Sequence, residues 1–336
     1  MGDTIMRKVK YLFKTIIHMD FKNMFKITRN ISKKAKKPFL IALIDIIYCG
    51  FKYQAGYYDY QEFEFYLLNK KERKTYLTRG INNQLVKKYN DKNYWYLLQD
   101  KIEFNKKFNK YLKRDWIDLR NTTLEDFKEF LKNKDYVIAK ELDNCGGKGI
   151  SKVKVSKNIE KLRNELIENK QYLVEEIIKQ HPSLNELYDG SVNTLRFFTY
   201  FDGKNAYILN TILKIGNNGF VDNFSSGGMY TFIDKNGKVM CPAIDQKDNK
   251  ITIHPTSKKE IINYEIPNFK KACDLVKKAS KEIKEIKYIG WDVAITKDDA
   301  CLVEGNEFPG VFQIKPSFDN GKHEGILTEY KKYMDI

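Results

Sequence analysis

The pattern of the chain changes near residue 134, and this change constrains the fold more than any other feature. Residues 38–100 have the spacing and aromatic content of helices, whereas short apolar runs alternate with turn residues further on. Thr194–Phe201 and Ala206–Ile215 flank an Asp-Gly turn, which is a hairpin signal. This mixed, mostly antiparallel order predicts an α+β fold and not a doubly wound parallel sheet.

The same patterns predict the other elements of the second part of the chain. We expect strands or hairpins at Tyr136–Leu142, Ile150–Val155, Gln171–Ile178, Tyr230–Asp234, Lys238–Met240, Asp292–Thr296 and Ala300–Glu304. We expect helices near Ile159–Asn169 and over Tyr264–Lys284.

The charge of the chain is uneven. Its 336 residues have a net charge of +16, and residues 1–37 contain eleven basic and only two acidic residues. Phe13, Ile17, Phe21 and Met24 have helical spacing within residues 11–27, which leaves two interpretations open. One is a basic amphipathic helix on an anionic membrane surface, and the other is a helix packed on its own domain with a solvated lysine face.

Several classes of protein are excluded. The basic residues include only eight arginines, and no zinc-finger, RNP or recognition-helix pattern is present, so we predict no nucleic-acid partner. The best apolar run, Phe39 to Phe51, is interrupted by Asp45 and is too short to span a membrane. Five scattered cysteines without a CxxC pair, and no signal-peptide pattern, favour the cytoplasm.

Three hard oxygen ligands lie near the last predicted hairpin. Asp292 begins one strand, Glu304 ends the next, and Asn306 follows it. Across a hairpin these side chains converge on one face, which suits Mg²⁺ bound together with phosphates. The alternative is a solvated acidic turn.

A glycine-rich segment, Gly146-Gly147-Lys148-Gly149, separates two predicted strands. Its backbone N–H groups suit phosphate binding, although it lacks the Walker A spacing and a plain hairpin turn explains it equally well. Lys140 lies in the apolar strand before it, where a buried ammonium needs an anion. Arg196 is the only arginine after Arg163, in a chain that uses lysine almost everywhere, which indicates bidentate phosphate or carboxylate recognition, with a structural ion pair as the alternative. The segment 223–228 (NFSSGG) is a candidate substrate loop.

In this order, the features resemble the ATP-grasp superfamily. More closely, the strings DYQEFEFY, SVNTLRFFTY, VDNFSSGGM, YIGWDVAIT and LVEGNEFPG resemble the sugar-transfer-associated ATP-grasp family, also labelled hexapeptide transferase-related, of bacterial surface-polysaccharide clusters. The resemblance extends from about Asp59 to Gln313. It implies two α+β lobes that clamp ATP, preceded by a basic helical region. The expected division is a segment 1–37, a helical domain 38–100, a small lobe 101–170 and a large lobe 171–336.

The resemblance also implies roles for individual residues. Lys101 and Lys140 would contact ATP phosphates, under a loop formed by Gly146, Gly147, Lys148 and Gly149. Glu175, Glu176, Ile177 and Ile178 would form the adenine-reading hinge. Arg196 would act with Lys140 on the transferring phosphoryl group, and Asp292, Glu304 and Asn306 would hold Mg²⁺. No acid follows the hinge before Glu186, so Gln180 is the candidate ribose contact. Lys214, Asn223, Ser225 and Ser226 would line the acceptor side.

The implied activity is an ATP-dependent carboxylate–amine ligase that forms an amide through an acylphosphate. We expect it to join an amino acid or other amine to a uronic acid or related carboxylate of capsule, O-antigen or teichuronic-type glycan, in the cytoplasm or at the inner face of the membrane. An ATP-grasp phosphotransferase acting on a hydroxyl, with His181 or His323 as base, and a nucleotide-binding scaffold remain alternatives. The sequence predicts no oligomeric state.

Overall fold

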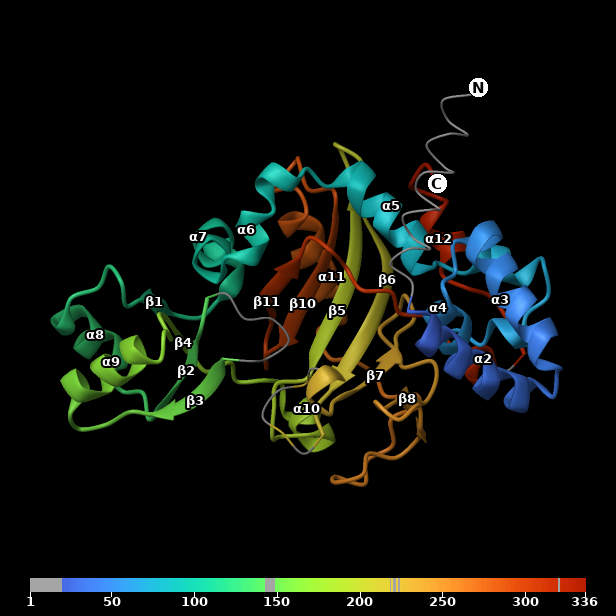
Figure 1. The fold of residues 1–336 in the computed structure, drawn as a ribbon. Helices are drawn as coiled ribbons and strands as arrows, with labels where there is room; N and C mark the ends of the chain where they lie inside the picture. The colour runs from blue at the N-terminus through green and yellow to red at the C-terminus, as the bar shows by residue number, and fades with distance from the viewer. Residues whose placement is uncertain (1–19, 143–148, 218, 220–221, 223, 320) are drawn as a thin grey trace. The chain divides into compact units, whose positions relative to one another are not determined.

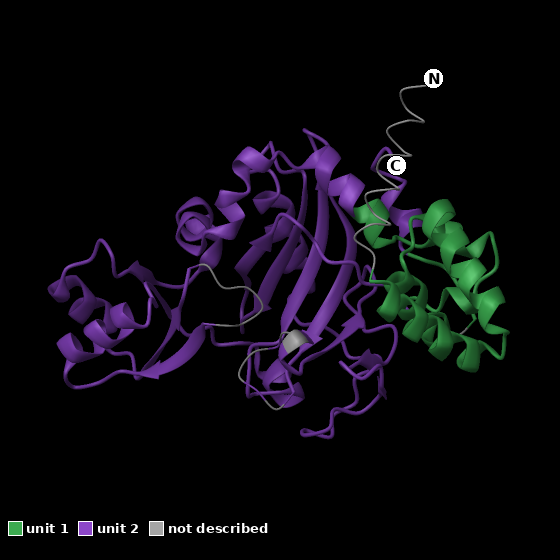
Figure 2. Ribbon diagram, in the orientation of Figure 1, with its two compact units in different colours: residues 1–82, 315–325 green, residues 83–314, 326–336 purple. Residues whose placement is uncertain are grey.

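The computed structural model describes residues 20–142, 149–217, 219, 222, 224–319 and 321–336 (Figure 1). These residues form two compact units, one of residues 1–82 with 315–325 and one of residues 83–314 with 326–336 (Figure 2). The division differs from the four expected segments, because residues 83–100 belong to the second unit and residues 315–325 to the first.

The first unit is helical. Its α-helices are α2 (Phe21–Ala35), α3 (Phe39–Tyr53), α4 (Tyr57–Glu62) and the start of α5 (Arg79–Tyr89). Its short 3-10 helices are η1 (Phe65–Leu67), η2 (Glu72–Thr75) and, near the end of the chain, η5 (Pro316–Phe318). The helix predicted over residues 11–27 differs from α2, since Asp20 accepts a hydrogen bond from the backbone N–H of Asn23 and so caps the N-terminus at Phe21. Residues 11–19 lie outside the described part.

The second unit contains two antiparallel sheets. One has the strand order β1 (Trp116–Asp118), β4 (Leu173–Glu176), β2 (Tyr136–Lys140) and β3 (Ile150–Lys154). The other has the order β11 (Ala300–Asn306), β10 (Tyr288–Ile295), β5 (Thr194–Phe201), β6 (Ala206–Ile215), β7 (Met229–Phe232), β8 (Ala243–Ile244) and β9 (Lys250–Ile251). Its helices are α5, η3 (Lys92–Tyr94), α6 (Tyr96–Gln99), α7 (Lys101–Leu112), α8 (Leu124–Leu131), α9 (Ile159–Glu168), α10 (Pro182–Leu187), η4 (Phe224–Ser226), α11 (Phe269–Ala279) and α12 (Leu327–Tyr330).

The α+β prediction is therefore confirmed, and most predicted elements are present. The strand β4 ends at Glu176 inside the four-stranded sheet, so the first sheet extends past the expected boundary at residue 170. The predicted helix over Tyr264–Lys284 is shorter, because Pro267 disfavours helix at the residue before it and α11 begins only at Phe269. The hairpin at Asp234–Lys238 is present, but its second arm forms only an isolated bridge between Ile233 and Val239.

Each sheet has its own apolar core. In the four-stranded sheet, Val137, Ala139 and Val174 pack with Phe127 and Leu166 of α8 and α9. The core of the seven-stranded sheet includes Trp291 and Phe197, together with residues of α7 and α11. No helix among the described residues is long and apolar enough to cross a membrane.

Gly305, between Glu304 and Asn306, is packed directly on this second core. A Cβ atom at Gly305 would lie 2.9 Å from Leu98 and 3.1 Å from ring atoms of Phe104 and Trp291. We predict that Gly305→Ala lowers the free energy of unfolding by about 1–3 kcal/mol, because the two rings are buried and have little room to move. Gly56→Ala adds its methyl group to open space and should change stability by less than about 0.5 kcal/mol in the same urea titration. Equal stability of the two variants would contradict this packing.

Candidate functional site

Asp292 is the centre of a buried charge cluster on the seven-stranded sheet. Its carboxylate accepts hydrogen bonds from Arg196 Nε, from Arg196 Nη2 at 2.7 Å and from Lys214 Nζ at 2.8 Å. The register explains the cluster, since Asp292 on β10 lies opposite Arg196 on β5, and Arg196 lies opposite Ile212 on β6. Lys214, two residues along from Ile212, therefore points to the same face.

The charges in this cluster stabilise one another. Burial alone would raise the pKa of Asp292, but Arg196 and Lys214 outweigh it and hold this pKa far below its ordinary value. Burial lowers the pKa of Arg196 and of Lys214, yet the surrounding carboxylates raise both pKa values overall. All three groups thus stay charged in a place where an unpaired charge would be very costly.

Glu304 and Asn306 lie next to this cluster on β11. Asp292 is opposite Glu304 in the ladder, and Glu304 Oε1 is 3.6 Å from Arg196 Nη2 and 3.5 Å from Asn306 Nδ2. Desolvation and the neighbouring Asp292 carboxylate raise the pKa of Glu304, although its side chain is 51% exposed. The three predicted metal ligands are therefore brought together at one edge of the site.

Their fit to Mg²⁺ is uneven. Glu304 and Asn306 offer oxygen atoms that no strong ion pair occupies, and Mg²⁺ commonly takes one or two carboxylates and leaves its other positions to water and phosphate. The oxygens of Asp292 are occupied by Arg196 and Lys214. Within the described residues no group of three or more His, Cys, Asp or Glu side chains could hold a metal. The oxygen atoms of Glu304 and Asn306 therefore fit a Mg²⁺ ion whose other ligands are phosphates and water.

Arg196 keeps one amino group for another partner. Nε and Nη2 bind Asp292, whereas Nη1 has no hydrogen-bond partner among the residues that the structure describes. The arginine passes beside Gly290, where a Cβ atom would lie 3.3 Å from Arg196 Cδ and 3.4 Å from Pro309. A fixed guanidinium with a remaining donor suits an anionic ligand.

A second buried cluster surrounds Glu175 in the four-stranded sheet. Glu175 accepts hydrogen bonds from Asn105 Nδ2 and Arg114 Nη2, both at 2.8 Å, and forms an ion pair with Lys140 at 2.5 Å. Burial alone would raise the pKa of Glu175, but Arg114 and Lys140 lower this pKa to about 2. The anion that Lys140 requires is therefore a carboxylate of the protein itself.

Arg114 connects the two sheets. Its Nη2 binds Glu175, and its Nη1 donates to the carbonyl oxygen of Leu302 at 2.6 Å, two residues before Glu304 on β11. A single guanidinium thus ties the strand that carries Glu175 to the strand that carries Glu304.

The predicted hinge, residues 175–178, begins at Glu175, the residue that Arg114 binds. Glu175 and Glu176 end β4, where the backbone N–H of Glu176 donates to Asp115, and Ile177 and Ile178 continue beyond the strand. Gln180 then forms an isolated bridge with Thr296, at the end of β10. The segment is therefore held at both ends.

Gln180 has a structural environment. Its Nε2 donates to the carbonyl oxygens of Tyr188 and Ser191, and its Oε1 accepts from the backbone and side chain of Asn193. These bonds occupy the amide on both sides, so they favour a structural role. Its assignment as a ribose contact stays a prediction.

The glycine loop is described only at its margins. Gly146, Gly147 and Lys148 lie outside the described residues. Gly149 has a φ of 69°, a conformation that favours glycine. Lys101, the first residue of α7, donates to the carbonyl oxygen of Leu142 at 3.0 Å, immediately before the undescribed segment.

Of the residues predicted on the acceptor side, the structure describes the side chains of Lys214 and Ser226. Lys214 is buried, between Asp292 and Asp222, whose Oδ1 is 3.8 Å from its Nζ. Ser226 is exposed at the end of η4, which also contains Ser225. Asn223 and the side chain of Ser225 lie outside the described part.

Three residues of the clusters were not predicted. Asp222 receives hydrogen bonds from the backbone and hydroxyl of Thr194, and burial raises its pKa. Arg114 could have been found by the signal that indicated Arg196, because it too is a rare arginine among many lysines. Nothing in the sequence distinguishes Asn105 or Asp222 from other polar residues.

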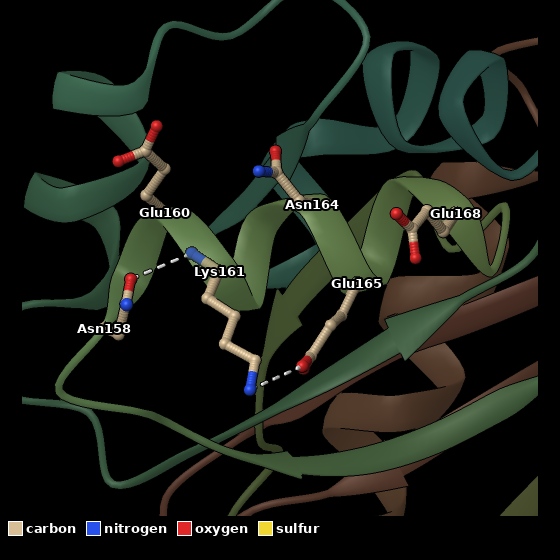
Figure 3. A pocket seen from close by; sticks show the side chains of 6 residues that line it. All are labelled: Asn158, Glu160, Lys161, Asn164, Glu165 and Glu168. Atoms are coloured by element: carbon tan, nitrogen blue, oxygen red, sulfur yellow. Dashed lines mark hydrogen bonds and ion pairs between the residues drawn. The ribbon is translucent and has the colours of Figure 1, made fainter.

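A surface depression of about 420 Å³ lies elsewhere, on α9 (Figure 3). It is lined by Asn158, Glu160, Lys161, Asn164, Glu165 and Glu168. Its one cation, Lys161, pairs with Glu165 along the helix, and Figure 3 shows the acidic side chains spread over an open face. We assign no function to it.

Comparison with known proteins identifies the family. The model of the family described as sugar-transfer associated ATP-grasp matches residues 80–317, so the chain belongs to this family. This confirms the family predicted from the sequence. A search of curated proteins finds no match.

Solved structures give weaker likenesses. D-alanine–D-alanine ligase from Bacillus anthracis is 14% identical, with a TM-score of 0.41, over 75% of this chain and 74% of its own. N5-carboxyaminoimidazole synthetase from Staphylococcus aureus, complexed with ADP, is 13% identical, with a TM-score of 0.41, over 64% of this chain and 46% of its own. The chain thus spans less than half of that enzyme. We infer nothing about activity from these likenesses.

The Glu175 cluster predicts acid sensitivity. Because the pKa of Glu175 falls from 4.5 to about 2 on folding, its ionised form stabilises the fold above pH 4.5, and this contribution is lost as the pH falls toward 2. The loss amounts to about 3 kcal/mol. Urea unfolding at about pH 5, 4 and 3 should show a steeper fall for the wild type than for Glu175→Gln. Parallel curves would contradict the assignment.

Proposed function

We propose that the protein is an ATP-dependent carboxylate–amine ligase. The observation that carries the proposal is the fixed pair of cationic groups, Lys140 beside Glu175 and Arg196 beside Asp292, with Glu304 and Asn306 next to the second. Such an arrangement suits phosphoryl transfer, where catalysis consists mainly of positioning and charge neutralisation. Membership of the ATP-grasp family supports the assignment.

The proposed reaction has two steps. A carboxylate oxygen of the acceptor attacks the γ-phosphorus of ATP, the bond to the β–γ bridging oxygen breaks, and ADP leaves. The amine nitrogen then attacks the acyl carbon and loses a proton, and phosphate leaves with the former carboxylate oxygen. No nucleophile of the protein is required.

The residues take distinct roles in this proposal. Lys101 and Lys140 bind phosphates together with the loop of Gly146, Gly147, Lys148 and Gly149. Backbone groups of Glu175–Ile178 read adenine, and the Nη1 group of Arg196 stabilises the transferring phosphoryl group. Glu304 and Asn306, with Asp292 behind them, would hold Mg²⁺, which when bound neutralises phosphate charge. Lys214, Ser225, Ser226 and Asn223 are proposed to bind the acceptor.

Membership of the sugar-transfer-associated family supports a glycan substrate. We propose a uronic acid or related carboxylate of a bacterial surface polysaccharide, and an amino acid or other amine as its partner. A lipid-linked acceptor would place the enzyme on the cytoplasmic side of an anionic membrane, to which residues 1–37 are expected to contribute.

The reaction is tested with Mg-ATP and panels of uronic acids, free and nucleotide-linked, together with amines. We expect equal amounts of ADP and phosphate that depend on both partners, and an amide product detected by mass. ADP without phosphate, with a phosphorylated acceptor, would instead establish a phosphotransferase. Absence of Mg-ATP binding would contradict both reactions.

The proposed binding of ATP phosphate by Lys140 can be tested separately from the ion pair that Lys140 forms with Glu175. Glu175→Gln removes the carboxylate but keeps the ammonium, whereas Lys140→Met/Glu175→Gln removes both charges and leaves no unpaired carboxylate. We expect the double variant to bind Mg-ATP at least about tenfold more weakly than Glu175→Gln in calorimetric titrations, because a phosphate contact is lost. Lys154→Met removes an exposed lysine of the same sheet and should leave the affinity unchanged. Equal affinities of the single and double variants would overturn the assignment.

A further inference from the structure

The helix α3 exposes an apolar surface that the described residues of its own unit do not cover. Six large apolar side chains of α3 are exposed, with Leu40 and Ile44 reaching 67% and 66%. We call them the apolar stripe: Leu40, Ile41, Ile44, Ile47, Tyr48 and Phe51. Positions 40, 44, 47 and 51 follow the i, i+4, i+7 spacing of one helical face. Single exposed apolar residues are ordinary, but a continuous face of them marks an interaction site.

The opposite face of α3 is what holds the helix in the fold. Ala42, Ile46, Cys49 and Tyr53 are buried. Asp45, the one charge within the apolar run, is bound by both amino groups of Arg73 at 2.7 Å and by the Tyr60 hydroxyl. Because these partners bind Asp45, its carboxylate does not disturb the apolar stripe. The described residues that pack against α3 contact its opposite face, so they do not explain why the stripe is apolar.

The neighbouring helix α2 carries positive charge. α2 and α3 are consecutive helices of the first unit (Figure 1), and the rings of Phe25 and Phe39 stack with centroids 6.2 Å apart. Phe21 and Phe25 are themselves exposed. The exposed basic residues of α2 and the turn after it are Lys22, Lys26, Arg29, Lys33, Lys34, Lys36 and Lys37.

We propose that the apolar stripe and the basic residues of α2 form a surface that binds anionic phospholipid. Aliphatic and aromatic side chains bordered by lysines are the composition of helices that lie in a membrane interface. Each lysine near an anionic leaflet strengthens binding, and its long side chain lets the ammonium reach the headgroups. The 15 residues of α3 extend about 22 Å, less than the ~30 Å hydrocarbon core, so α3 lies in the plane of the membrane and does not cross it.

Charge favours a membrane over a second copy of the chain. Self-association through the stripe would bring two strongly basic α2 helices close together, and like charges at an interface oppose binding. An anionic lipid surface instead offers both apolar contact and opposite charge. The surface includes residues 40–51, beyond the segment 1–37 for which membrane contact was expected, and it does not depend on the ligase reaction.

Flotation of the full-length protein with vesicles tests the surface. We expect binding to phosphatidylcholine vesicles that contain phosphatidylglycerol, little binding to phosphatidylcholine alone, and weaker binding at high salt. Leu40→Ser/Ile44→Ser keeps the net charge and should lower the bound fraction about tenfold or more. Met240→Ser/Ile253→Ser removes two exposed apolar side chains of the second unit and should bind like the wild type.

Tryptophan fluorescence gives a second readout, and the substitution that it needs keeps the stripe apolar. Tyr48→Trp, within the stripe, should shift its emission to the blue on anionic vesicles and be quenched by brominated lipid, whereas Tyr58→Trp on α4 should not. Unchanged flotation of Leu40→Ser/Ile44→Ser would overturn the proposal. So would a wild-type dimer that becomes a monomer on this substitution and ignores vesicles. Because no substrate is present, either result leaves the ligase proposal standing.

Discussion

The candidate site depends on one requirement: three charged groups that meet inside an antiparallel sheet have to neutralise one another. Asp292 on β10 lies between Arg196 on β5 and Lys214 on β6, and none of the three could be buried alone without a large cost. The pairing fixes the direction of Arg196 and leaves its Nη1 group for a ligand. Glu304 and Asn306, at the sheet edge, are the oxygen donors that we propose for Mg²⁺.

A second carboxylate repeats the same device in the other sheet. Glu175 holds Lys140 in position as Asp292 holds Arg196, and Arg114 ties Glu175 to strand β11 through the carbonyl oxygen of Leu302. Each of the two cationic groups proposed to act on phosphates is therefore held by a buried carboxylate. Preorganised charges of this kind need little rearrangement when an anion binds, which is what phosphoryl transfer requires.

The sequence predicted those parts that follow from local patterns. Thr194–Phe201 and Ala206–Ile215 were predicted with the bounds that β5 and β6 have, because turn residues and alternation define them. The convergence of Asp292, Glu304 and Asn306 followed from a single hairpin. Contacts between distant segments could not be predicted: the bonds of Gln180 to Asn193, the link through Arg114, and the inclusion of residues 315–325 in the first unit depend on tertiary packing.

We propose that an acceptor carboxylate is activated by phosphoryl transfer, and an isotope label tests this step. The protein is incubated with Mg-ATP, amines and a panel of acids whose carboxylates all carry ¹⁸O, and the released phosphate is analysed by mass spectrometry. An acylphosphate transfers one carboxylate oxygen to phosphate, so we expect phosphate that contains one ¹⁸O atom. Amide formation with unlabelled phosphate, or a phosphorylated acceptor that keeps its ¹⁸O on the carboxylate, would contradict it.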